Sequence, residues 1–209
     1  MSGLVPAMSM FPLGSVLFPH MPLRLRVFEE RYLVMLSELV EAEDTRFGVV
    51  LIERGFEVGG GEHRFGVGTT ADVAQIGAED GVVGLVAQGT ERFEVETWLD
   101  DDPYPRAEVR VLPELVWDER LEPLRAETEQ LVRRTLAQAS EFSENVWPAD
   151  VELADEPVPA LWQLAAIAPV TALDQVKLLR SESAEALLLS LVELTRDAAL
   201  AWETPWPLE

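Results

Sequence analysis

Few residues in this chain are suited to covalent chemistry, and they are scattered. There is no cysteine, His20 and His63 are the only histidines, and Lys177 is the only lysine. Nucleophilic catalysis requires a serine, cysteine or threonine beside a base, and Lys177 and Ser181 stand four residues apart, as a serine–lysine dyad on a helix would. Side chains at this spacing are ordinary helix neighbours, and a lysine base must be buried for its pKa to fall. We therefore predict no catalytic residues and keep a hydrolase only as an alternative.

The sequence also contains no complete motif for a metal-binding or a phosphate-binding site. A metal site requires clustered histidine, cysteine or carboxylate ligands, and the adjacent Glu62 and His63 have no further ligand at a suitable spacing. The acidic run at 100–102 lacks the glycine and the final glutamate of a calcium loop. The glycines between 59 and 68 match neither a P-loop nor a dinucleotide-binding turn. We predict no metal and no cofactor.

The charge excludes one class of partner. The chain carries 16 Lys+Arg against 38 Asp+Glu, a formal net charge of -22 over 209 residues. Nucleic-acid binding depends on cations that neutralise phosphates, and anionic membrane surfaces attract the same cations. Residues 1–110 have 19 acids and 9 bases (19 − 9 = 10 excess acids), and residues 111–209 have 19 acids and 7 bases (19 − 7 = 12 excess acids). The negative charge is therefore a property of the whole surface and not of an acidic tail.

Composition also indicates the cellular compartment in which the protein is expected. Hydrophobic residues make up 48% and charged residues 26% of the chain, which is typical of a folded protein. No apolar run reaches the ~18–20 residues of a membrane span. Residues 1–10 contain no basic residue ahead of their apolar part, unlike a secretory signal. We expect a cytoplasmic protein.

Any site must be positioned by helices and strands. The first part of the sequence predicts short strands around one helix. Alternating apolar and basic residues at 23–27 predict a half-exposed strand, and the apolar run at 47–52 predicts a buried one. Similar patterns predict strands at 8–11, 69–76, 82–87, 93–98 and 107–111, with hairpin loops at 59–61 and 89–91. From 28 to about 41, apolar residues recur every three or four positions, which predicts a helix. Its apolar positions are Phe28, Tyr32, Met35, Leu36, Leu39 and Val40.

After Pro113 the pattern becomes helical. Helices are predicted at 118–142, 161–167 and 184–199, and Thr171 with Asp174 three residues later forms a variant of the capping box. Trp98 and Trp162 lie in apolar elements and are expected to be buried, whereas Trp202 and Trp206 are expected at the surface or at an interface. Strands followed by helices indicate an α+β protein.

One stretch is more specific than these patterns. MFPLGSVLFPHMPL at 10–23 leads into VFEERY at 27–32, and together they resemble the opening of the Lon protease N-terminal domain. Further motifs similar to those of this family follow in the same order: VGTTADV at 67–73, GTERF at 89–93, YPRAEV at 104–109 and LDQVKLL at 173–179. The last motif departs from the family pattern in the order of its lysine and glutamine. The resemblance covers residues 10–200.

This resemblance implies a particular fold and argues against ATP-dependent proteolysis. It implies a PUA-like antiparallel β-barrel with one packed helix at 8–113, followed by a C-terminal helical bundle at 114–201, in agreement with the strand and helix patterns. A full Lon protease also contains an ATPase module with a P-loop and a peptidase module with a serine–lysine dyad. The chain ends at Glu209 with neither module, so we expect no ATP-dependent proteolysis.

The function that the resemblance implies is the binding of polypeptides. The family's N-terminal domain is associated with recognition of unfolded or tagged polypeptides, and a protease or a chaperone is a further partner that the resemblance allows. A module with a net charge of -22 should favour basic or neutral polypeptides. We expect a monomer or weak dimer that binds neither nucleic acid nor membranes. The alternative is a small-molecule or partner-protein sensor, since PUA-like barrels have concave faces.

The expected peptide contacts lie in the most specific stretch, where apolar and charged groups share one edge of the barrel. They are Phe18, Pro19, His20, Met21, Arg24, Glu29, Glu30 and Arg31. The competing interpretation is that residues such as Phe18, Phe28, Tyr32 and Arg92 are required by the fold alone.

Overall fold

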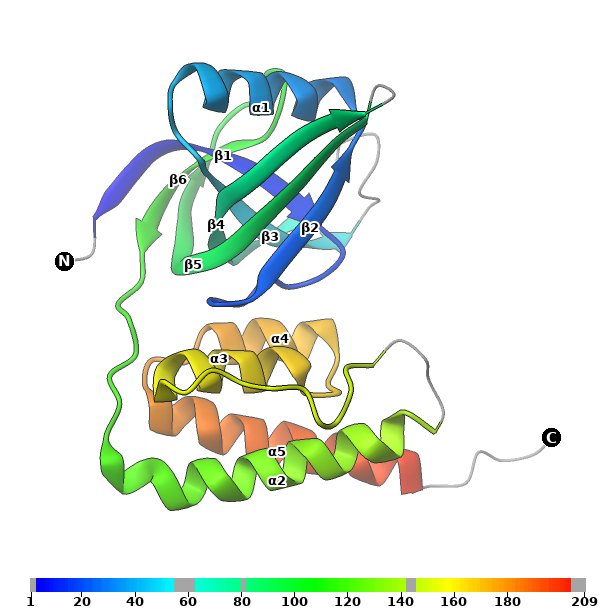
Figure 1. Cartoon of the computed structure of the whole chain (residues 1–209). Helices are drawn as coiled ribbons and strands as arrows, with labels where there is room; N and C mark the ends of the chain where they lie inside the picture. Colours follow the sequence, from blue (N-terminus) through cyan, green and yellow to red (C-terminus); the bar gives the residue numbers. More distant parts are fainter. Residues whose placement is uncertain (1–2, 55–62, 80–81, 142–145, 204–209) are drawn as a thin grey trace. The chain divides into compact units, whose positions relative to one another are not determined.

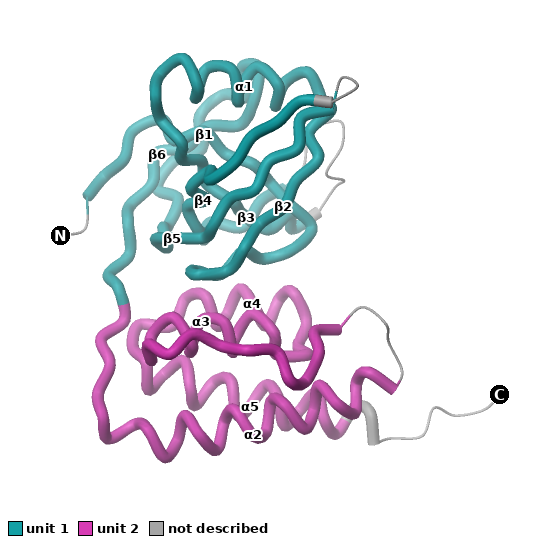
Figure 2. Tube along the Cα trace, viewed as in Figure 1, with its two compact units in different colours: residues 1–114 teal, residues 115–209 magenta. Residues whose placement is uncertain are grey.

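The computed structural model describes residues 3–54, 63–79, 82–141 and 146–203 (Figure 1). The chain divides into two compact units, Met1–Glu114 and Leu115–Glu209 (Figure 2). The first unit contains β1 (Leu4–Leu13), β2 (Pro22–Val27), α1 (Glu30–Glu41), β3 (Arg46–Arg54), β4 (His63–Glu79), β5 (Val82–Trp98) and β6 (Arg106–Val111). The second contains η1 (Glu119–Leu121), α2 (Glu122–Ala139), α3 (Pro157–Ile167), α4 (Ala172–Leu179) and α5 (Ala184–Glu203). The expected mixed α+β class is confirmed.

The six strands form one sheet in the order β2-β5-β4-β3-β1-β6, and β6 also pairs with β5. The expectation of a wholly antiparallel sheet is wrong at one pair, because β1 and β3 are parallel, with Met10 opposite Gly48. Two parallel strands require a long crossover. Here residues 14–45, which include β2 and α1, provide it.

The predicted hairpin at 89–91 is wrong, because β5 runs without a break through this segment. The first part of β5 pairs with β2 over Val83–Gln88 and its last part pairs with β6 over Phe93–Trp98. Between these two partners, the loop before β2 crosses the strand. The N–H of His20 donates to the Gly89 carbonyl at 2.8 Å, and the N–H of Gly89 donates to the Met21 carbonyl at 2.9 Å. Gly89 is therefore a crossing point and not a turn.

Helix α1 packs on the sheet through one face. Tyr32, Met35 and Leu36 are buried, and the rings of Tyr32 and Phe11 stack with their centroids 4.1 Å apart. The helix begins two residues later than the apolar spacing predicts, so Phe28 lies outside it and is 59% exposed. The predicted helix face is also too wide at its other end, where Val40 is 62% exposed.

The second unit is helical. Each of its four α-helices contributes buried side chains, among them Trp162, which is 2% exposed as predicted. The predicted cap of α4 is confirmed, since the Thr171 hydroxyl accepts a hydrogen bond from the N–H of Asp174 at 3.2 Å. The predicted hairpin tip at 59–61, Trp206 and the side chain of Trp202 lie outside the described residues. No helix in the described part of the chain combines the length and apolar character that a membrane span requires.

Candidate functional site

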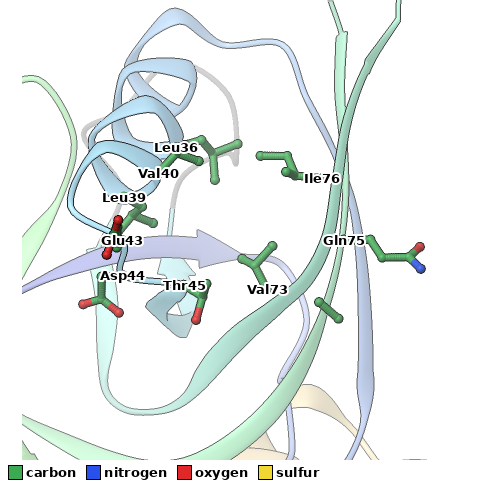
Figure 3. A pocket seen from close by; sticks show the side chains of 10 residues that line it. Leu36, Leu39, Val40, Glu43, Asp44, Thr45, Val73, Gln75 and Ile76 are labelled. Carbon is green, nitrogen blue, oxygen red and sulfur yellow. The ribbon is translucent and has the colours of Figure 1, made fainter.

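An apolar pocket of about 350 Å³ opens between the second half of α1 and β4 (Figure 3). The helix, the turn that follows it and the strand each contribute to the lining, which consists of Leu36, Leu39, Val40, Glu43, Asp44, Thr45, Val73, Ala74, Gln75 and Ile76. Figure 3 shows Leu36 and Val40 facing Ile76 across the pocket, whereas Gln75 points away from it. The volume is in the range of ligand-binding pockets, roughly 300–1,000 Å³.

The pocket has a buried floor and an exposed apolar mouth. Leu36 is 4% exposed and belongs to the core beneath α1, whereas Val40 is 62% and Ile76 is 47% exposed. Single exposed apolar residues are normal on a protein surface, but two that face each other across a pocket indicate a place for an apolar ligand group.

The polar rim of the pocket is formed by the turn that ends α1. The N–H of Glu43 donates to the Val40 carbonyl at 3.2 Å, and the N–H of Asp44 donates to the Leu39 carbonyl at 3.0 Å. These two bonds define a Schellman motif, in which the residue at the position of Glu43 is left-handed and is usually glycine. Glu43 has a φ of 54°. An L-residue in this conformation costs about 1–2 kcal/mol, and strain of this kind accumulates at functional sites.

The other polar residues of the rim are used within the fold. The Asp44 carboxylate accepts hydrogen bonds from the backbone N–H of Arg46 at 3.1 Å and from its Nε at 3.2 Å. The Thr45 hydroxyl donates to the Asp72 carboxylate at 2.6 Å. Asp44 therefore holds the turn to the start of β3 and Thr45 holds it to β4, while Glu43 is the exposed acid at the pocket mouth.

The loop at 18–21, where peptide contacts were expected, is largely part of the core. Phe18 is 1% exposed and Pro19 is also buried, so these two side chains offer little surface to a ligand. His20 is left-handed, with a φ of 61°, and Met21 packs against the core of the sheet. Only His20 and Met21 present part of their side chains to solvent.

The remaining expected residues lie at and beyond β2. Arg24 and Glu30 are exposed. Arg31 and Glu29 form an ion pair with an Nε–Oε2 distance of 3.2 Å, and their side chains are 16% and 18% exposed. Strand β2 has 6 residues, which at about 3.3 Å per residue separates the loop from the start of α1 by about 20 Å. The structure therefore distributes the expected residues before, within and after β2 and does not gather them in one cluster.

The lysine of the possible dyad has the wrong electrostatics for a base. The side chain of Lys177 is 67% exposed, and its ammonium donates to the Asp174 carboxylate at 2.7 Å. This hydrogen bond and the charge of Asp174 raise the pKa of Lys177, whereas a base for Ser181 would need a lowered pKa. Within the described residues, no group of three or more histidines and carboxylates is placed to hold a metal ion.

The residue patterns predicted that the pocket residues belong to a helix and a strand of the fold, but they did not predict the cavity between them. Leu36, Leu39 and Val40 fit the predicted helix face, and Val73 and Ile76 fit a predicted strand. The only local signal was an apolar helix face that continued into the acidic turn at 41–44. This signal is weak, because it depends on a left-handed Glu43 that no local pattern reveals.

Comparisons with known proteins give a consistent result. Residues 7–197 match the model of a family described as the ATP-dependent protease La (LON) substrate-binding domain. A crystal structure of a Lon N-terminal domain protein from Xanthomonas campestris is 23% identical, with a TM-score of 0.64 over 90% of this chain and 98% of that chain. The N-terminal domain of a Mycobacterium avium complex Lon protease is 16% identical, with a TM-score of 0.60 over 91% of this chain and 98% of that chain. A comparison with curated proteins finds no match. At these identities the two structures establish a shared fold.

Proposed function

Because this chain belongs to the family of the ATP-dependent protease La (LON) substrate-binding domain, we propose that it is a non-catalytic module that binds polypeptides. The observation that carries the proposal is the extent of the match, residues 7–197, which includes most of both units. The apolar pocket supports it, since unfolded chains expose the apolar side chains that such a pocket accepts.

The two alternative functions have less support. A hydrolase would depend on Lys177, whose pKa is raised and whose ammonium is engaged by Asp174. A small-molecule sensor would be favoured by polar groups that converge on an enclosed pocket. In the pocket beside α1, Asp44 and Thr45 bind other parts of the fold and Gln75 points away (Figure 3).

The same proposal includes a more detailed architecture for each of the two units. We assign the strands to a PUA-like barrel at 8–113 and the helices to a bundle at 114–201. The pairing of β6 with both β1 and β5 supports a sheet that returns on itself. Contacts of α2 with α3 and α5, and of α4 with α3 and α5, support a bundle. The division of the chain after Glu114 supports the boundary.

The partners follow from the family and from the charge. We propose unfolded or tagged polypeptides as ligands and a protease or chaperone as a further partner. We also propose a cytoplasmic location and a monomer or weak dimer. A net charge of -22 disfavours nucleic acid and anionic membranes. Affinity capture from native cells with mass spectrometry separates an adaptor, which co-purifies with a protease, from a module that retains varied misfolded proteins.

Two surfaces on the first unit remain candidates for the contact. One is the pocket between α1 and β4. The other consists of the exposed members of the sequence-predicted set, Arg24 and Glu30, with the partly exposed His20 and Met21.

Fluorescence anisotropy tests the proposal. The full chain is titrated into a labelled, permanently unfolded protein whose cysteines have been alkylated with iodoacetamide, and into the same protein in its folded, disulfide-bonded form. We expect saturable binding of the unfolded form only. No binding of the unfolded form by a chain that retains its circular dichroism spectrum would overturn the proposed function.

A further inference from the structure

The pocket lies beside an edge of the sheet that is open within the described part of the chain. Strand β3 pairs with β4 only as far as Asp72, opposite Arg46, and the N–H of Val73 then donates to the Thr45 carbonyl at 2.9 Å. Beyond a bulge at Ala74, β4 continues to Glu79 with β5 as its one partner among the described strands. Its opposite edge therefore presents backbone N–H and C=O groups to solvent.

This edge lacks the usual protection against pairing. Native sheets protect their edges with charged residues, prolines or very short strands. Residues 75–78 of β4 are Gln, Ile, Gly and Ala, and all four are exposed. The bulge at Ala74 comes before this segment and leaves 75–78 in continuous register with β5.

The register shows which side chains of an added strand would reach the pocket. Ile76 lies opposite Leu85 of β5, so the two share one face of the sheet. Leu85 is 3% exposed and belongs to the core that contains Met35 and Leu36 of α1. A residue placed beside Ile76 on the open edge would share the same face and would point toward α1, into the pocket.

We propose that an extended polypeptide segment binds by adding a strand to the open edge of β4, with one apolar side chain in the pocket between Val40 and Ile76. This inference rests on the proposed function and specifies how the polypeptide is held. Backbone hydrogen bonds to the edge supply affinity that is independent of sequence, and the pocket selects an apolar side chain. Such a division of roles suits a module that accepts many unfolded chains.

The charge at the pocket mouth specifies the residues beside the apolar one. Glu43 is exposed at the rim, and Glu41, two residues before it, is also exposed. Asp44 is partly neutralised by Arg46 at 3.2 Å. The preferred segment therefore carries Lys or Arg two residues from the apolar side chain, on the same face of the added strand, where it approaches the Glu43 carboxylate.

The probe is a fluorescein-labelled heptapeptide, TKTLTKT, in which the leucine and both lysines share one face of an extended chain. Two analogues carry N-methyl groups on alternate amides, either at the odd or at the even positions. Strand addition uses the N–H groups along one edge of the peptide. We expect one analogue to lose about tenfold in affinity relative to the other. Equal affinities of the two analogues would overturn strand addition.

Protein variants locate the site. Val40→Asp places a charge at the pocket mouth and should weaken binding of the peptide by about tenfold or more. Val116→Asp is the matched control, because Val116 is 83% exposed and lies in the other unit. It should leave the affinity unchanged. Circular dichroism and sedimentation of both variants establish that fold and oligomeric state are retained.

The outcomes separate this inference from the proposed function. A chain that binds neither the peptide nor unfolded protein contradicts both. If the Val40→Asp variant binds unfolded protein as tightly as the unmodified chain does, the result contradicts the role of the pocket but not the proposed function. A Val40→Asp variant that changes self-association but not peptide binding identifies the edge as a contact between copies, and this also overturns the inference.

Discussion

At the scale of single residues, Glu43 is a non-glycine residue in a conformation that favours glycine. It occupies the left-handed position of a Schellman motif with a φ of 54°, where glycine is usual. The same residue provides the exposed acid at the pocket mouth. A conformational cost at this position is consistent with a functional reason to keep a carboxylate there.

Replacement of Glu43 by glycine should therefore stabilise the fold and weaken binding. The substitution removes about 1–2 kcal/mol of backbone strain, and the greater freedom of glycine in the unfolded chain offsets about 0.4–1 kcal/mol of this gain. We expect the free energy of unfolding in urea to rise by about 0.5–1 kcal/mol, while TKTLTKT binds more weakly at low salt. Ala42→Gly is the control, since Ala42 is right-handed at a φ of -81°, and it should lower the stability. If Glu43→Gly instead lowered the free energy of unfolding, the result would contradict the backbone strain assigned to Glu43.

At the scale of elements, β5 organises the first unit. It pairs with β4 along most of its length, with β2 near its start and with β6 near its end. The loop before β2 crosses it at Gly89, where a Cβ atom would overlap the backbone carbonyl of Phe18. Backbone atoms on both sides of this contact are held by hydrogen bonds, so neither can shift at low cost.

The crossing predicts that Gly89→Ala is strongly destabilising. We expect a loss of about 3 kcal/mol in the free energy of unfolding, measured by urea denaturation. Gly84→Ala on the same strand is the matched control, because a Cβ atom there meets only the Gly77 carbonyl at 3.9 Å. The Gly89→Ala variant should therefore be much less stable than the Gly84→Ala variant. Equal stabilities of the two variants would contradict the close backbone contact at Gly89.

At the scale of the whole molecule, the charge determines how partners approach. The net charge of -22 is shared by both halves of the sequence. It produces a negative field that attracts cationic segments before any contact forms. Such a field acts mainly on the association rate and is screened by salt.

Association with a basic peptide should accordingly depend on ionic strength. Between 0.01 and 0.15 M salt the Debye length falls from about 30 Å to about 8 Å, and we expect the association rate constant of TKTLTKT in stopped-flow anisotropy to fall by about tenfold. The dissociation rate constant should change little. A peptide with glutamine in place of both lysines is the control. If it showed the same salt dependence, steering by the net charge would be excluded.

Local sequence patterns predicted most elements correctly. The strands at 23–27, 47–52 and 107–111, the helix that ends near Glu41 and the capped helix after Thr171 all form as expected. Each depends on residue spacing within one element, and apolar periodicity reports such spacing directly. The family resemblance was likewise contained in ordered motifs, and the match over residues 7–197 confirms it.

The errors arose where distant segments meet. A glycine followed by polar residues at 89–91 is typical of a turn, yet the Phe18 backbone crosses β5 there, a contact between residues far apart in sequence. The parallel pairing of β1 with β3 and the pocket between α1 and β4 have the same origin. The sequence by itself determined most of the elements, the acidic surface and the family. The tertiary structure alone decided which strand edge stays open beside which helix face, because packing between distant segments leaves no periodic trace in either of them.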